Sequence, residues 1–386
     1  MLDPATGATL ADFNGDHYFT PASNTKILTL ATCLEVLGDT VPGMQYTKTI
    51  DSKLVIRGTA DPTFLHPGFQ SFQKAFHWLE NQEDTLIVLF EDHFSDNIYG
   101  KGWAMDDYFE SYQVGRSALT IYGNCYRIST TGDSLHPLKV EPSFFGQRIK
   151  EELIWKSWKK QWGIPSIEAK GKFEEKFIPV PPTYNLYLLS DTLNKSIEDY
   201  ALLSSRENWR TLYSTPIDTV LRRMMHQSDN FIAEQMLLVC AGVKFDLLKQ
   251  DTMIKWMLDS TLTSLPQRPK WVDGSGLSRY NLMTPQSIVH VLLKLWKEQP
   301  RERILSLFPA GGVSGTIAEM YPGKYGKPYV FAKTGGMSGV HCLSGYIVCK
   351  SGKVLIFSFM HNNFVGSNKA WKAEMQRLLE QIRDRF

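Results

Sequence analysis

The sequence predicts an α/β (α+β) fold that consists of one discontinuous domain and an inserted, mixed β-rich domain. Helical patterns of apolar residues are regular near the N terminus and again from about Pro216, whereas residues 91–200 alternate short strand patterns with Gly, Pro and aromatic residues. We therefore expect residues 1–60 and 205–386 to form the first domain and residues 61–204 to form the insertion, since a domain tolerates an insertion where its two chain ends lie close together.

Each element rests on a local pattern. After Pro21, apolar residues recur at helical spacing from Ile27 to Leu37, and Gly38 predicts the end of that helix. The elements expected next are strands over 46–50 and 54–57, a helix over 71–80, a buried strand over 86–90, a helix over 149–162 and a Pro-rich break over 179–182. The C-terminal part predicts helices over 217–225, 231–239, 287–296 and 369–382, and strands over 330–332, 343–348 and 354–359.

The composition is that of an ordinary globular protein of 386 residues, with 43% hydrophobic and 21% charged residues. Lys and Arg (42) nearly balance Asp and Glu (40), so the net charge of +2 gives no electrostatic reason to expect a nucleic-acid or anionic-membrane partner. No apolar run approaches the ~18 residues that a transmembrane helix needs. The five cysteines form no C-x-x-C pair, and Cys33 and Cys240 lie in apolar helical patterns, so we expect them in the core.

Three short motifs occur in order along the chain: Ser23-Asn24-Thr25-Lys26, Ser228-Asp229-Asn230 and Lys333-Thr334-Gly335. Together they form the S-x-x-K, S-x-N and K-T-G set of penicillin-interacting serine enzymes. Each motif alone is a weak signal, and Lys-Thr-Gly is the only one of the three strings that occurs once.

Ser23 has the chemical context of a nucleophile. A serine three residues before a lysine on a helix shares its face, with Cβ atoms roughly 5–6 Å apart. The first helical turn also lies at the positive end of the helix dipole. Leu30 and Leu34 make the helix below Lys26 apolar, and desolvation lowers the pKa of a lysine, so that its neutral amine can accept the serine proton.

Copies of the first two motifs occur at Ser71–Lys74, Ser157–Lys160 and Ser95–Asn97. Ser71 has no Lys-Thr-Gly at a comparable separation, and Ser95–Asn97 precedes Ile98-Tyr99-Gly100, which is not a helical pattern. We therefore interpret Ser71 and Ser157 as residues of solvated faces.

Lys333-Thr334-Gly335 is followed by Gly336-Met337-Ser338-Gly339. This string is typical of an edge strand beside a cleft, where glycine permits the close approach of a substrate backbone and an extended peptide can add as a further strand. It is equally typical of a glycine-rich hairpin, and the string alone does not decide between the two.

The ordered motifs resemble those of the D-Ala-D-Ala carboxypeptidase/endopeptidase family of class C low-molecular-mass penicillin-binding proteins, of the penicillin-binding protein 4 kind. Segments that extend the resemblance over about residues 1–360 are Gly58–Thr63, Gly102–Asp107, Ser117–Leu119, Asp273–Asn281, Phe308–Pro309, Gly315–Thr316 and Leu343–Tyr346. The long separation of Ser23 from Ser228 is similar to that of this family and unlike that of compact class A β-lactamases. The resemblance implies a β-lactamase/DD-peptidase-like antiparallel sheet flanked by helices.

The resemblance also implies catalytic roles for motif residues. Ser23 would be the acyl-accepting nucleophile and Lys26 the general base. Ser228 would relay protons to the leaving amine, and Asn230 would hold a substrate amide and orient Lys26. Lys333 would add positive potential.

For substrate binding, the resemblance implies that Thr334 binds the terminal carboxylate of D-Ala, in one strand with Gly335 and Gly336. The main-chain N–H groups of Ser23 and Gly336 would form an oxyanion hole, in which one donor is typically worth ~10²–10³ in rate. Related enzymes often carry Thr or Ser where this chain has Gly336, so one possible carboxylate contact is absent here.

An acidic residue of the inserted region binds the amino group of the stem-peptide side chain in this family. Asp107 or its neighbour Asp106, with Trp103 and Arg279, would shape that pocket, and the alternative is a solvated acidic pair in a loop. We expect no cofactor and no metal, because four histidines show no metal-ligand spacing: His66, His77, His93 and His136.

The sequence thus predicts a serine-type D-Ala-D-Ala carboxypeptidase, and a candidate DD-endopeptidase, that acts on peptidoglycan stem peptides through a Ser23 acyl-enzyme and is acylated by β-lactams such as penicillins. The alternatives are a serine β-lactamase or esterase on the same scaffold, and a catalytically decayed peptidoglycan-binding protein. The resemblance implies a periplasmic location. Met1–Pro4 begins no signal peptide, so we expect any export signal to have been lost with a preceding segment.

Overall fold

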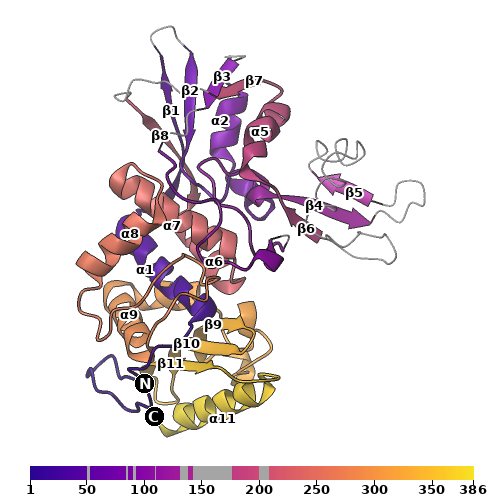
Figure 1. Cartoon of the computed structure of the whole chain (residues 1–386). Coiled ribbons are helices and arrows are strands. Elements are labelled where there is room, and N and C mark those ends of the chain that lie inside the picture. The colour runs from indigo at the N-terminus through magenta and orange to yellow at the C-terminus, as the bar shows by residue number, and fades with distance from the viewer. Residues whose placement is uncertain are drawn as a thin grey trace.

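The computed structural model describes residues 1–49, 53–83, 86–89, 93–108, 110–130, 138–141, 176–199 and 208–386. These residues build an elongated molecule with three sheets (Figure 1). The helices are α1 (Lys26–Val36), α2 (Lys74–Glu80), α5 (Asn185–Leu193), α6 (Ile217–His226), α7 (Asn230–Phe245), α8 (Gln250–Trp256), α9 (Pro285–Glu298), α10 (Arg301–Leu307) and α11 (Lys369–Arg385). The strands are β1 (Thr40–Lys48), β2 (Leu54–Gly58), β3 (Leu86–Leu89), β4 (Cys125–Thr130), β5 (Leu138–Glu141), β6 (Lys176–Pro179), β7 (Ser196–Asp199), β8 (Arg210–Pro216), β9 (Val330–Met337), β10 (Val340–Val348) and β11 (Val354–Asn362).

An antiparallel sheet of order β11-β10-β9 forms the centre of the C-terminal body. The central strand β10 is buried on both faces because its side chains alternate between two cores. Tyr346 lies against Trp296 of α9 on one face, whereas Leu343 joins a cluster with Leu379 of α11 on the other. The expected antiparallel sheet flanked by helices is therefore confirmed.

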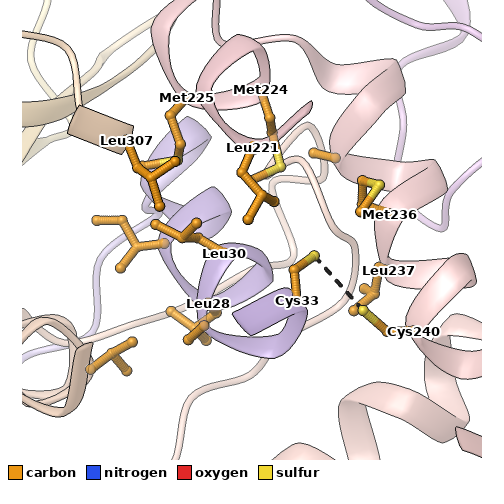
Figure 2. Close-up of a cluster of buried hydrophobic side chains, with 14 of the residues drawn as sticks. Leu28, Leu30, Cys33, Leu221, Met224, Met225, Met236, Leu237, Cys240 and Leu307 are labelled. Atoms are coloured by element: carbon orange, nitrogen blue, oxygen red, sulfur yellow. Dashed lines mark hydrogen bonds between the residues drawn. The ribbon is translucent and has the colours of Figure 1, made fainter. Parts of the chain in front are cut away.

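Helices α1 and α7 form the interior of the helical layer, because Lys26–Cys33 of α1 and Phe231–Ala241 of α7 are buried at every position. Their sequences are apolar around the whole circumference, which is typical of a helix enclosed by other elements. Cys33 of α1 and Cys240 of α7 meet there, with their Sγ atoms 3.7 Å apart (Figure 2). The expected core position of these two cysteines is confirmed.

A second, mixed sheet has the order β7-β3-β2-β1-β8. Strand β1 pairs antiparallel with β2 and β8, whereas β3 pairs parallel with β2 and β7. Leu79 of α2 and Leu189 of α5 belong to the core that covers this sheet. The sheet takes strands from both sides of the boundaries expected near residues 60 and 205, so a cut at these residues separates hydrogen-bonded strands.

A third, antiparallel sheet of order β5-β4-β6 projects from the side of the molecule (Figure 1). The helix expected over 149–162, and with it Ser157 and Lys160, lies outside the described residues, as does His136. Among the helices that are described, none combines the length and the apolar character required to cross a bilayer.

Two expected elements differ from the structure in a way that matters for the motifs. The helix expected over 71–80 begins only at Lys74, and Ser71 lies in a preceding 3-10 turn over Pro67–Phe72. Both Ser71 and Lys74 are exposed, which confirms their interpretation as residues of a solvated face. The strand expected over 330–332 continues to Met337 and so contains the whole Lys-Thr-Gly motif.

Candidate active site

Ser23 lies in a 3-10 turn over Ala22–Thr25 that leads directly into α1. The Thr25 hydroxyl donates to the Ala22 carbonyl at 2.9 Å and holds this turn closed. The buried amide of Asn24 donates to Ser344 Oγ on β10 at 2.7 Å. A Cβ on Gly335 of β9 would come within 2.4 Å of the Pro21 carbonyl, so the turn packs directly against that strand. The nucleophile candidate is therefore fixed to both β9 and β10.

Lys26 is fully buried, and three oxygen atoms surround its amine. Nζ donates to Ser23 Oγ at 3.2 Å and to Asn230 Oδ1 at 2.6 Å. It also donates to the Ser275 carbonyl at 2.8 Å. The first two motifs of the sequence thus meet at a single nitrogen atom.

Burial lowers the pKa of Lys26 to about 8, against the opposing charges of Glu234, Asp273 and Asp229. Lys333 is also fully buried, and burial together with the positive charge of Lys26 lowers its pKa well below the usual value. A large fraction of the Lys26 amine is therefore neutral near pH 8, in the form that can accept a proton.

The second and third motifs are joined by another lysine contact. Lys333 Nζ donates to Ser228 Oγ at 2.8 Å and to the Thr334 carbonyl at 2.8 Å. Ser228 holds a left-handed backbone conformation with φ of 57°, directly before α7. Asp229 caps this helix by accepting from the Ile232 N–H at 3.0 Å. The cap and the turn aim the Ser228 hydroxyl at Lys333.

The Lys-Thr-Gly strand β9 lies at the edge of its sheet in the described residues, and Ser338–Gly339 connects it to β10 as a tight turn. Gly339 has a φ of 70°, which glycine adopts without strain. The string is therefore both an edge strand and the first arm of a hairpin. The Thr334 hydroxyl contacts Thr316 Oγ1 at 2.8 Å, and a Cβ on Gly336 would meet nothing within 4 Å.

The loop that carries the predicted stem-peptide pocket reaches the site through Tyr112. The Tyr112 hydroxyl donates to Asp107 Oδ1 at 2.9 Å, and its carbonyl accepts from Asn230 Nδ2 at 2.9 Å. Asp107 is thus linked to the catalytic motifs, whereas Asp106 is exposed.

Trp103 and Arg279 lie at two other points around the motifs. Trp103 Nε1 donates to Asp273 Oδ2 at 3.0 Å, which ties the inserted region to the 273–281 loop. Arg279 is exposed and donates to the Ser338 carbonyl at 3.0 Å, at the end of β9.

Sequence reasoning missed a set of buried polar residues next to Lys26. Glu234 follows Asn230 by one helical turn, so its position on the same face of α7 is a signal that could have found it. Arg116, which pairs with Glu234 at 2.6 Å, and Asp273, which anchors the 273–281 loop, carry no comparable local signal. In the part of the chain that the structure describes, no three His, Cys, Asp or Glu side chains gather as a metal site.

The chain is similar to known proteins in sequence and in structure. A model of the D-Ala-D-Ala carboxypeptidase 3 (S13) family matches residues 1–150 and 204–382. The D-alanyl-D-alanine carboxypeptidase DacB of Haemophilus influenzae is 23% identical over 426 residues, which cover 98% of this chain and 87% of that protein.

Two solved structures share the fold across the whole chain. The crystal structure of penicillin binding protein 4 from Haemophilus influenzae has a TM-score of 0.73 at 19% identity, and the match covers 99% of this chain and 95% of that one. The predatory endopeptidase Bd3459 of Bdellovibrio bacteriovorus, acylated by penicillin G and in complex with the immunity protein Bd3460, has a TM-score of 0.53 at 15% identity, with coverages of 99% and 89%.

Proposed function

The chain belongs to the D-Ala-D-Ala carboxypeptidase 3 (S13) family, and on that premise we propose that it is a serine-type D-Ala-D-Ala carboxypeptidase that acts through an acyl-enzyme on Ser23. The observation that carries the proposal is the buried amine of Lys26, which lies 3.2 Å from Ser23 Oγ and 2.6 Å from Asn230 Oδ1. A hydroxyl beside a desolvated amine is the arrangement that activates a serine nucleophile.

In the acylation step, Ser23 Oγ attacks the carbonyl carbon of the penultimate D-Ala while its proton passes to neutral Lys26. Main-chain N–H groups of Ser23 and Gly336 stabilise the oxyanion that forms. The proton then passes, with Ser228 as relay, to the nitrogen of the terminal D-Ala as the C–N bond breaks. Water hydrolyses the resulting ester and restores Ser23. The 2.8 Å contact of Lys333 with Ser228 supports this relay, because it fixes the hydroxyl that transfers the proton.

In substrate binding, the terminal carboxylate of D-Ala contacts Thr334 and lies beside Lys333, while the peptide backbone adds to the edge of β9 beyond Phe331, where β9 is bridged to Ala310. Gly335 holds the strand against the Ser23 turn, and Gly336 leaves open space for the close approach of a substrate backbone. The amino group of the stem side chain lies near Asp107, with Trp103 and Arg279 around it. The position of Asp107, one hydrogen bond from Tyr112 and two from Asn230, supports this assignment.

The substrates are peptidoglycan stem peptides, and the cross-linked D-Ala peptide bond is a second target of the same chemistry. β-Lactams acylate Ser23 as substrate mimics. The structurally similar endopeptidase Bd3459 of Bdellovibrio bacteriovorus is acylated by penicillin G, which supports this expectation. The location that follows from this substrate is the periplasm.

The test is covalent labelling with a fluorescent penicillin, read by intact mass and peptide mapping, together with D-Ala release from a defined pentapeptide muropeptide. Wild type gains one adduct on Ser23, and Ser23→Ala gains none. Ser71→Ala, which alters the exposed copy of the motif, is labelled like wild type. A folded wild type that gains no adduct and releases no D-Ala excludes the proposed function, and rapid repeated turnover of nitrocefin shows a β-lactamase instead.

A further inference from the structure

Glu234 is a fully buried carboxylate that takes no part in the steps above. It lies on α7 one turn after Asn230, the residue that contacts Lys26 directly. A charged carboxylate in such a position is costly unless every oxygen is paired, and here both oxygens are. Oε1 accepts from the Ser275 N–H at 2.7 Å, and Oε2 accepts from Gln250 Nε2 at 2.8 Å and from Arg116.

Arg116 supplies the counter-charge from the inserted region. Its Nε and Nη2 donate to Glu234 Oε2 at 2.9 Å and 2.6 Å, and its own side chain is only 4% exposed. Asp96 lies on the other side of the guanidinium at 3.4 Å. Burial alone would raise the pKa of Glu234, but the Arg116 charge and the hydrogen bonds from Ser275 and Gln250 lower it below the usual value. Glu234 is therefore ionised.

The main chain of Ser275 connects this ion pair to the catalytic amine. Its N–H donates to Glu234, and its carbonyl accepts from Lys26 Nζ at 2.8 Å. The Gly274 carbonyl accepts from Thr29 Oγ1 of α1 at 2.6 Å. A Cβ on Gly274 would come within 2.5 Å of the Ala233 carbonyl, so the loop is pressed between α1 and α7 with no room to shift.

We propose that Glu234, held in place by Arg116, is a positioning residue for Lys26 that acts through the main chain of Ser275. This inference deepens the proposed function and rests on it, because it assigns the group that sets the orientation and charge of the general base. It also gives the inserted region a part in the reaction, since Arg116 comes from that region.

The electrostatic consequence follows from the charges that face Lys26. Three carboxylates raise its pKa, with Glu234 the largest, then Asp273 and Asp229, and Lys333 is the cation that packs nearby. Loss of the Glu234 charge therefore lowers the pKa of Lys26, on the order of 1 unit for one nearby charge. Neutral Lys26 is the active form, so the acidic limb of the acylation rate moves to lower pH by the same amount.

The experiment uses the full chain labelled with ε-¹³C lysine. The Lys26 signal is assigned by its loss in Lys26→Met and titrated in wild type, Glu234→Gln and Glu234→Asp, alongside the pH profile of acylation by a fluorescent penicillin. The double variant Glu234→Gln/Arg116→Gln removes both charges, so that no arginine is left buried without a partner if the single variant does not fold. Arg57→Gln is the matched control, because it breaks the pair of Arg57 with Asp246 at the far end of α7.

We expect the Lys26 pKa and the acidic limb to fall together by about 1 unit in Glu234→Gln, and to fall together by less in the double variant, because loss of the Arg116 cation offsets part of the loss of the Glu234 anion. Glu234→Asp keeps the charge and hence the position of the limb, but acylation is slower because the shorter side chain releases Ser275. Arg57→Gln lowers the melting temperature, and it changes neither the pKa of Lys26 nor the pH of the acidic limb of acylation. The proposal is overturned if the folded variants lose only thermal stability while the Lys26 titration stays at the wild-type pH. That titration decides the role of Glu234 even if wild type is not acylated, an outcome that would count against the proposed function alone.

Discussion

Lys26 has three oxygen contacts and no exposed surface, whereas Lys74 of the second S-x-x-K copy is exposed on α2. We expect Lys26→Ala to slow acylation by about 10²–10⁴-fold, the usual worth of a general base, and Lys74→Ala to leave the rate unchanged. Stopped-flow measurement of penicillin labelling checks both variants. A loss in Lys74→Ala as large as that in Lys26→Ala would contradict the assignment of Ser23, and a loss in Lys74→Ala alone would identify Ser71 as the nucleophile.

The two glycines that end the Lys-Thr-Gly-Gly string differ in the space around them. A side chain at Gly336 points into open space, so Gly336→Thr fits and supplies the hydroxyl that related enzymes often have. We expect it to accelerate penicillin acylation by about tenfold, the worth of a hydrogen bond to a charged carboxylate.

Gly335→Thr is the matched control for this substitution. Its Cβ would approach the Pro21 carbonyl at 2.4 Å and displace the Ser23 turn, so acylation falls. The same assay compares both variants with wild type. A Gly336→Thr protein that is slower than wild type would show that the carboxylate lies elsewhere.

At the scale of elements, the 273–281 loop packs closely against the turn before α1 at Gly276. Gly276 has a φ of 82°, and a Cβ there would lie 1.9 Å from the Ala22 carbonyl. We expect Gly276→Ala to lower the free energy of unfolding by about 3 kcal/mol or more, because backbone strain and displacement of the turn add. Gly7 has a similar φ of 74° with nothing within 4 Å, so Gly7→Ala costs only about 1 kcal/mol. Urea unfolding compares the two variants. Equal losses of unfolding free energy would show that the contact of Gly276 with Ala22 does not contribute to stability.

Elements with a strong apolar pattern could be predicted from the sequence, including the short strands β2 and β3, and elements without such a pattern could not. The patterns of α1, α6, α7, α9 and α11 predict their helices to within a turn at most ends. The short helices α8 and α10 have seven residues each, too few for a periodic pattern to stand out. Ser71 illustrates a boundary error, because Pro67 starts a 3-10 turn there before α2 begins.

The candidate site also has a part that could be predicted from the sequence and a part that could not. Contacts within one motif, such as Ser23 with Lys26, follow from helical spacing. Lys26 contacts the main chain of Ser275, and Glu234 pairs with Arg116. These contacts depend on how distant segments of the chain pack together, which no local sequence pattern encodes. Gly336 is an exception, since its lack of a side chain could be read directly from the sequence.

At the scale of the whole molecule, two buried lysines make stability depend on pH. The pKa of Lys26 is about 8 in the folded chain and 10.5 when the side chain is free in water. At this site the unfolded chain therefore binds more protons between these values, and Lys26 contributes a rise in the free energy of unfolding across that window, about 3 kcal/mol in full. Lys333 acts in the same direction.

We expect the urea midpoint of wild type to rise between about pH 8 and about pH 10 relative to that of Lys26→Met, which has no titrating amine at this position. Lys74→Met is the control, because it removes a lysine that is exposed on α2. Tryptophan fluorescence follows the unfolding. Identical slopes in wild type and Lys26→Met would contradict the depressed pKa.

The division of the chain into residues 1–60 with 205–386 and residues 61–204 stays a prediction. Composition alone located the change of pattern, but β1, β2 and β8 pair in one sheet with β3 and β7, so the hydrogen bonds run across both limits. Such pairing between strands far apart in the chain leaves no trace in local sequence, which is why the change of pattern could suggest an insertion but not the strand pairing that crosses its limits.

The reacting groups come from segments at opposite ends of the chain, and they meet only when β9, α1 and α7 are all in place. An unfolded or partly folded molecule has no activated hydroxyl and therefore does not react with a penicillin. A fluorescent penicillin therefore becomes a titrant of native molecules, and the bound dye per mole of polypeptide reports the yield of correct assembly in a refolding reaction or a crude extract.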